Sequence, residues 1–159
     1  MAQLSHLDEK GRARMVDVSE KEVTSRIAVA RGTIHMRPET LELIRQGKVE
    51  KGDVFSVARV AGIMAAKKTS ELIPMCHPLN ITSVEITLIP ESTPARVDIE
   101  ASVRVSGKTG VEMEAMTAVA VAGLTIYDMC KAVDREMALG EIRLVEKSGG
   151  KSGTFTRKE

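Results

Sequence analysis

Apolar and polar residues alternate most regularly in residues 95–106 (ARVDIEASVRVS), where every second side chain from Ala95 onward is apolar. A period of two is typical of a strand that buries one face and exposes the other. Three more strands are indicated by a weaker alternation in residues 23–36, by a shared apolar face in residues 81–89 and by the segment 141–147. The pattern therefore predicts four strands.

Two short segments between the first and second strands carry helix signals. Pro38 opens the first helix and Gly47 stops it, because proline suits the first helical turn and glycine suits the position after the last. Asp53 is a good N-cap for a second helix, which is predicted to run to about residue 72. The first two strands are therefore joined by a helical crossover.

A third helix is predicted from about Val111 to Asp134, and its stretch Ala115–Tyr127 carries no charge. This uncharged run has 13 residues, and a bilayer needs roughly 20, so a membrane span is rejected. The run is more apolar than packing against one face of a sheet requires, so we expect the helix to be buried on almost all sides. We expect part of this burial to come from another subunit.

The predicted order is strand, helix, helix, strand, strand, helix, strand. With the two successive helices counted as one crossover, it becomes the split, ferredoxin-like β-α-β-β-α-β arrangement of the α+β class, an antiparallel sheet packed on helices. We divide the chain into a poorly ordered N-terminal segment (1–20), a single catalytic domain (21–147) and a flexible Gly/Lys/Ser tail (148–159). This fold hosts many functions and by itself selects none of them.

Composition excludes several classes of function. Aromatic residues make up 2% of the chain and its net charge is +1, which argues against stacking platforms and basic surfaces for nucleic acid. Cys76 and Cys130 are isolated from each other and from any zinc-site spacing, so no metal site is predicted. Two lone cysteines and an N-terminus without an apolar leader favour the cytoplasm.

Two Gly-Lys sequences, at residues 107–109 and 150–152, invite comparison with a phosphate-binding P-loop. A P-loop also needs glycine five residues before its Gly-Lys pair, where this chain has Ser102 and Val145, so P-loop chemistry is rejected. Glycine-rich backbone beside lysines can still hold phosphate oxygens through N–H groups and charge. Ordinary turns explain the pattern as well, and the pattern alone favours them.

Acidic residues mark both ends of the third predicted helix. Thr109 and Glu112 form the T-x-x-E pattern of a capping box, which is the local interpretation of Glu112. Glu114 gains from the helix dipole but partly loses water. Asp128 and Lys131 are spaced i,i+3, so they form either an ion pair or an acid and base near a cleft.

Helix geometry limits how these residues are used together. Glu114 and Asp128 are 14 residues apart, so they share a helix face but lie roughly 21 Å apart along the axis. One small site could scarcely use both from the same chain. If both are functional, the site is shared between subunits.

Met75, Cys76 and His77 lie in a loop bounded by Pro74 and Pro78. A histidine titrates near neutral pH and suits proton transfer, although a lone loop histidine is more often structural or exposed. Cys76 could equally be a small buried hydrophobe. The residues alone leave these alternatives open.

Five blocks of sequence resemble one known family, that of the cyclic pyranopterin monophosphate synthases, known as MoaC. The blocks are MVDVS (15–19), KGDVFSVARVAGIMAAKKTSELIPMCHPL (51–79), GKTGVEMEAM (107–116), LTIYDMCKAV (124–133) and KSGGKSG (147–153). They follow one another in the order of the family and cover nearly the whole chain. They are far more specific than any single motif above.

The resemblance implies a phosphorus–oxygen lyase of molybdenum cofactor biosynthesis. Its substrate would be (8S)-3′,8-cyclo-7,8-dihydroguanosine 5′-triphosphate, a cyclised dihydro-GTP, and its products cyclic pyranopterin monophosphate and pyrophosphate. The resemblance also implies a ferredoxin-like subunit in a homohexamer, a trimer of dimers with sites between subunits. No cofactor is required by the sequence, and Mg²⁺ accompanying the triphosphate is the one metal ion left open.

Site residues carry over by their place in the matching blocks. Asp128 and Lys131 would be the catalytic pair, with His77 as a third catalytic residue that shuttles protons. The substrate-binding residues implied are Met75, Cys76, His77, Met113, Glu114, Glu112, Lys51, Arg26 and Lys147. A non-catalytic nucleotide- or pterin-binding oligomer is the alternative, and it would hold its ligand unchanged.

Overall fold

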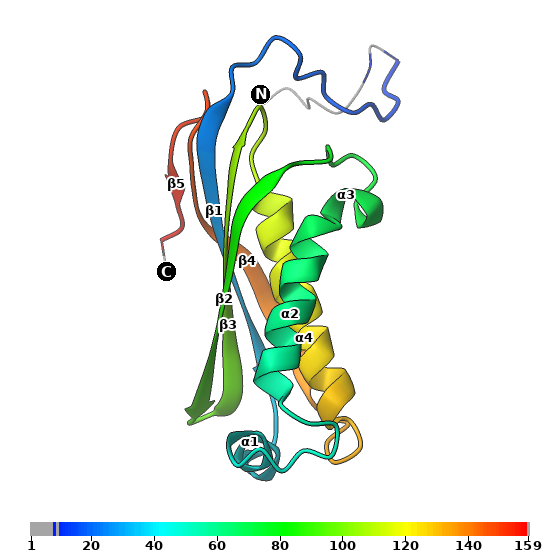
Figure 1. Cartoon of the computed structure of the whole chain (residues 1–159), viewed down its shortest axis with the longest axis vertical. Helices are drawn as coiled ribbons and strands as arrows, with labels where there is room; N and C mark the ends of the chain where they lie inside the picture. Colours follow the sequence, from blue (N-terminus) through cyan, green and yellow to red (C-terminus); the bar gives the residue numbers. More distant parts are fainter. Residues whose placement is uncertain (1–7, 9, 159) are drawn as a thin grey trace.

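One antiparallel sheet organises the chain in the computed structural model, which describes residue 8 and residues 10–158 (Figure 1). Its strand order is β2-β3-β1-β4-β5. The strands are β1 (Thr24–His35), β2 (Ile81–Ser92), β3 (Ala95–Gly107), β4 (Ala138–Ser148) and β5 (Phe155–Thr156). The order of the first four is that of a ferredoxin-like sheet, so the predicted α+β fold is confirmed. The segment predicted to be poorly ordered includes residues 1–7 and 9, which lie outside the described residues.

Helices cover one face of this sheet. They are α1 (Pro38–Arg45), α2 (Val54–Lys67), α3 (Thr69–Leu72) and α4 (Glu112–Cys130). Figure 1 shows α2 and α4 side by side on the sheet, and α1 at the end of the molecule where α4 finishes. The opposite face of the sheet carries no helix among the described residues. One end of α4 therefore lies at the end of the molecule that carries α1, and the other lies near α3 and the loop after it.

The predicted helix signals act as expected in α1 and α2. Pro38 occupies the first turn of α1, and Gly47, after the last turn, has a φ of +63°. The Asp53 side chain accepts the backbone N–H of Ser56 and so caps α2. The second helix was predicted to continue to residue 72, but it ends at Lys67 and the one-turn α3 follows.

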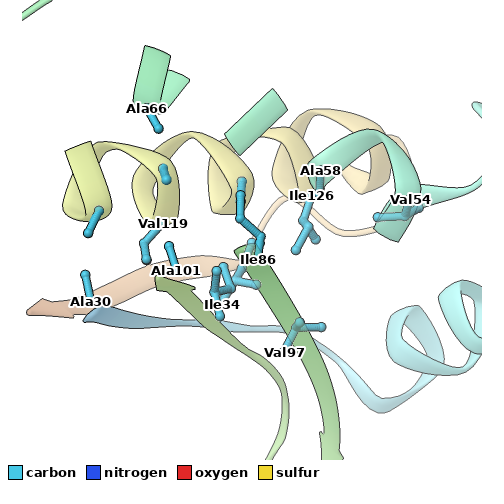
Figure 2. Packing of buried hydrophobic residues seen from close by; sticks show 14 of the residues in the cluster. Ala30, Ile34, Val54, Ala58, Ala66, Ile86, Val97, Ala101, Val119 and Ile126 are labelled. Atoms are coloured by element: carbon cyan, nitrogen blue, oxygen red, sulfur yellow. The ribbon is translucent and has the colours of Figure 1, made fainter. Parts of the chain in front are cut away.

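Small aliphatic side chains fill the space between helices and sheet. Figure 2 shows Val119 of α4 above Ala30 and Ala101, which project from neighbouring strands. Gly62 lets α2 approach closely, because an added Cβ there would lie 2.3 Å from Ile86 Cδ1 and 3.0 Å from a backbone oxygen of α4. The buried core is built of Val, Ile, Leu, Met and Ala side chains, together with Cys130.

The helix α4 differs from its prediction in two ways. It ends at Cys130 instead of Asp134, because Asp134 turns inward and accepts hydrogen bonds from α1. It is also not buried all round: 56% of its most apolar stretch is buried, and Leu124 is exposed. By length and composition it could cross a membrane, but here it is the central helix of the core. Exposed apolar side chains also lie on α2, namely Val57, Val60 and Met64.

The short strand β5 was not predicted. Its residues pair with Glu146 and Lys147, next to the start of the glycine-rich segment. A two-residue strand has no period, so the sequence pattern contains no signal for it. The predicted flexibility of residues 148–159 stays a prediction.

Candidate active site

Six of the predicted site residues line one hollow of about 260 Å³ at the N-terminal end of α4. They come from the loop after α3 and from the first turn of α4, and they are Met75, Cys76, His77, Glu112, Met113 and Glu114. The segment around Val16 and Val18 forms another wall. The structure therefore brings together two blocks that are 35 or more residues apart in the sequence.

Glu114 is the buried carboxyl group of this hollow, with 4% of its surface exposed. Burial raises its pKa, and the nearby charge of Glu112 raises it further. Burial and the charge of Glu114 also raise the pKa of the Cys76 thiol. The raised pKa lets Glu114 hold a proton more readily than an ordinary glutamic acid, whereas Cys76 is poorly suited to act as a thiolate.

His77 contacts the segment that precedes β1. Its Nε2 lies 2.7 Å from the carbonyl oxygen of Val16. Because a carbonyl oxygen only accepts, Nε2 carries a proton and donates it in this contact. The contact fixes the orientation of the ring against residues 16–18 at the wall of the hollow.

A second hollow of about 200 Å³ adjoins the first and is rich in cations. The two share Lys21, Thr109, Gly110 and Glu112 among their lining residues. The cationic side chains that line the second hollow are Lys21, Arg26, Lys108 and Lys147. Such a cluster suits an anionic group such as a phosphate.

The glycine-rich segment after β4 wraps around the Arg26 side chain. Gly149 and Gly150 have φ values of +95° and +74°, which favour glycine. An added Cβ would lie 2.2 Å from the backbone oxygen of Ser25 at Gly149, and 2.1 Å from the Arg26 guanidinium at Gly150. Arg26 itself donates to the carbonyl oxygens of Gly107 and Lys108, at 3.0 and 3.1 Å. These glycines are therefore needed for close packing around a cation.

Glu112 does not form the capping box that its spacing suggested. The helix begins at Glu112, so Val111 is the N-cap residue and no side chain caps it. The Glu112 carboxylate instead pairs with Lys147 Nζ at 2.9 Å, and the two side chains are 29% and 28% exposed. The capping interpretation was wrong because the helix starts two residues later than it would with Thr109 as its N-cap. The ion pair places a site lysine of β4 beside the first turn of α4.

Asp128, Lys131 and Lys51 form a separate cluster at the C-terminal end of α4. Asp128 carboxylate oxygens lie 2.7 Å from Lys131 Nζ and 2.9 Å from Lys51 Nζ. Hydrogen bonds and charge from the two lysines, Lys131 first, lower the pKa of Asp128 to about 2. The same hydrogen bond raises the pKa of Lys131. At neutral pH the cluster is thus a carboxylate between two ammonium groups.

The predicted site residues thus fall into two groups at opposite ends of α4. Glu114 lies in the first turn and Asp128 in the last, so they are separated by roughly 21 Å of helix. The chain brings Lys51 to Asp128, but it does not bring this cluster to the two hollows. The separation expected from helix geometry is confirmed.

Comparison with known proteins places the chain in a family. Residues 15–150 match the model of the MoaC family. The chain belongs to the MoaC family. A relative from Pelotomaculum thermopropionicum is 68% identical over 158 residues, 99% of this chain and 93% of the relative. A relative from Thermomicrobium roseum is 60% identical over 159 residues, 100% of this chain and 96% of the relative. Both relatives are named cyclic pyranopterin monophosphate synthase.

Some lining residues of this MoaC chain were not identified from the sequence. Lys21 lines both hollows, and Val16 and Val18 line the first. The two valines belong to the MVDVS block, so their place in a family motif was the available signal. The sequence identified Lys108 only as part of a glycine–lysine pattern. In the structure it lines the second hollow, and its Nζ donates to the carbonyl oxygen of Ser19 at 2.7 Å. Lys21 follows no motif, and only the folded chain identifies it.

Proposed function

We propose that this chain is a cyclic pyranopterin monophosphate synthase. It converts the cyclised dihydro-GTP to cyclic pyranopterin monophosphate and releases pyrophosphate. The observation that carries the proposal is the pair of adjoining hollows, one with four cations and one with a buried carboxyl group, a histidine and a thiol. This combination suits a ligand that is anionic at one end and rich in hydrogen-bonding groups at the other. The names of the relatives support the same reaction.

The cationic hollow accounts for the phosphate chemistry. Departure of pyrophosphate develops negative charge, and fixed cations in a partly closed site stabilise that charge. We assign Arg26 and Lys147 to the triphosphate, with Lys21 beside them. Met75, Cys76, Met113 and Glu114 bind the purine-derived part, and Glu112 orients Lys147 through their ion pair.

Asp128, Lys131 and His77 carry out the proton transfers in this proposal. With a pKa of about 2, Asp128 stays ionised at neutral pH and cannot be the proton donor of its cluster. Its carboxylate accepts a proton or orients the ammonium group of Lys131, which is the donor. His77 shuttles protons in the first hollow, and Lys51 adds positive charge beside Asp128.

We further propose that the active site is shared between subunits of a homohexamer. The two groups of residues lie too far apart in one chain to act on one substrate. Leu124 on α4, together with Val60 and Met64 on α2, leaves an exposed apolar surface on the helical layer that a second subunit would cover. In the assembly, the Asp128 cluster of one subunit would face the hollows of its partner.

The reaction is proposed to need no cofactor and to take place in the cytoplasm. Among the described residues no three His, Cys, Asp or Glu side chains gather as a metal site. Mg²⁺ carried in with the triphosphate is compatible with this chemistry. The cysteines Cys76 and Cys130 are both unbridged, as suits a reducing compartment.

Replacing Lys51 with alanine should weaken binding of the cyclised substrate, and added salt should weaken it further, because Lys51 adds positive charge beside Asp128 in the shared site and the substrate is a polyanion. Isothermal calorimetry with GTP and with the substrate measures the effect. Glu50→Ala, a neighbouring change of an exposed charge, serves as the control. Unchanged affinity in the Lys51 variant would remove this lysine from substrate recognition.

Turnover separates this function from that of a ligand-binding module. The protein is incubated with an excess of cyclised dihydro-GTP, and pyrophosphate is measured over time. An enzyme releases many equivalents per subunit, whereas a binding module retains the nucleotide unchanged. Release no faster than in a blank without protein would defeat the proposed function.

A further inference from the structure

We propose that Asp134 is a positioning residue that holds Lys51 against Asp128. It contacts neither the hollows nor the lysines. It joins the two chain segments on which the cluster is built, and so it acts on the proposed reaction through Lys51. The effect of Asp134 on the reaction rate rests on the proposed function, whereas its effect on the position of Lys51 does not.

Asp134 is a buried carboxylate with 2% of its surface exposed. Its Oδ2 accepts the backbone N–H of Arg37 at 2.9 Å and the hydroxyl of Thr40 at 3.0 Å. Its Oδ1 accepts the backbone N–H of Glu136 at 3.1 Å. The Arg37 side chain adds an ion pair to Oδ1 at 3.5 Å and a hydrogen bond to the carbonyl oxygen of Val133. Both carboxylate oxygens are therefore occupied.

These bonds fasten the end of α4 to the start of α1. The N-cap of α1 is Arg37, which has no side-chain cap of its own. Asp134, 97 residues away, accepts the backbone N–H of this N-cap residue, and Thr40, at 1% exposure, donates to the same carboxylate oxygen. The segment that carries Asp128 and Lys131 is thus fixed to the helix that leads into the loop carrying Lys51.

The contacts that Lys51 itself makes are too weak to hold its ammonium group in place, so its position depends on the loop that carries it. Its side chain is 49% exposed, and its Nζ contacts the Asp128 carboxylate and the Asp128 carbonyl oxygen, at 2.9 and 3.0 Å. An exposed ion pair contributes little to holding two long side chains in one geometry. The position of the 46–53 loop therefore decides whether the ammonium group stays beside Asp128.

A carboxylate is required at residue 134. The bonds to Arg37 and Thr40 reach one oxygen and the bond to Glu136 reaches the other, so both positions must accept. Asparagine has nearly the same size, but in either orientation its NH₂ group faces an N–H donor. Asp134→Asn therefore removes the hydrogen bonds accepted by one of the two carboxylate oxygens and keeps the volume of the side chain.

The test measures the titration of the Asp128 carboxyl group by carbon NMR in the assembled protein without substrate. In Asp134→Asn the pKa of Asp128 should rise from about 2 toward the ordinary value of 3.8, because Lys51 no longer stays beside it. Lys51→Ala should produce a similar rise. The double variant should show no further rise beyond Lys51→Ala, because both changes remove the same contact.

The rate provides a second readout. In Asp134→Asn, kcat for pyrophosphate release should fall about tenfold or more, and the fall should largely disappear when Lys51 is already alanine. Asp98→Asn, which removes a carboxylate paired with Arg96 on the opposite face of the sheet, should change neither readout. If the wild type releases no pyrophosphate, the proposed function fails while the titration still decides the role of Asp134.

A folded Asp134→Asn protein with an unchanged Asp128 pKa would overturn the inference, even if its melting temperature fell. If that variant does not fold, Thr40→Val removes one donor to the same oxygen and keeps the side-chain shape. It should raise the pKa of Asp128 in the same direction by a smaller amount. No change in Thr40→Val would then count against the positioning role.

Discussion

Replacing Asp128 with alanine should lower the rate of pyrophosphate release by about a hundredfold or more, because proton transfer by a positioned group contributes roughly that much. The protein should remain folded, since the Asp128 side chain is 57% exposed and its ion pairs lie at the surface. If Asp128 only formed an ion pair with Lys131 at the end of the helix, its loss would leave the rate almost unchanged. Lys131→Ala should show a comparable loss.

Steady-state assays paired with thermal melts check this prediction. Glu42→Gln is the matched control, because Glu42 is an exposed helical carboxylate that accepts a hydrogen bond from Gln46 four residues later. The control should match the wild type in both measurements. An Asp128→Ala protein that turns over within a few-fold of wild type would defeat the catalytic assignment.

Two inactive variants should restore activity when they are assembled together. Asp128→Ala removes the cluster at one end of α4, and Lys147→Ala removes a cation at the other end. If each site combines one end from each of two subunits, a mixed dimer has one intact site and one doubly altered site. Random pairing of equal amounts then yields about a quarter of wild-type activity.

The control for this experiment pairs two variants of the same end. Asp128→Ala mixed with Lys131→Ala leaves no intact site, because both residues belong to one cluster. The subunits are mixed after reversible dissociation, and light scattering confirms that they have reassembled. Restoration in the first mixture but not in the second supports the shared site, and failure in both places the site within one chain.

Much of the fold was predictable because its signals are local. The strand β3 alternates cleanly, since it lies inside the sheet with one face on the helices and one face open. Pro38, Gly47 and Asp53 mark helix ends through their own backbone preferences. The end of α4 was missed because it depends on Asp134, which bonds to a helix 97 residues earlier.

The site was predictable in its members but not in its contacts. The i,i+3 spacing of Asp128 and Lys131 predicted their ion pair, which has a distance of 2.7 Å. The contact of Lys51 with Asp128 spans 77 residues and depends on the packing of α2, which follows the Lys51 loop, against α4. The pair of Glu112 with Lys147 likewise depends on the sheet, which brings β4 beside the first turn of α4. Such long-range contacts follow from the assembled fold and not from spacing.

Mass spectrometry of a complete reaction tests the central claim most directly. Purified protein is incubated with cyclised dihydro-GTP alone, and the nucleotide, the pterin and pyrophosphate are quantified together. The proposed function predicts that the substrate disappears while equal amounts of cyclic pyranopterin monophosphate and pyrophosphate form. Substrate recovered unchanged at the end of the incubation would contradict it.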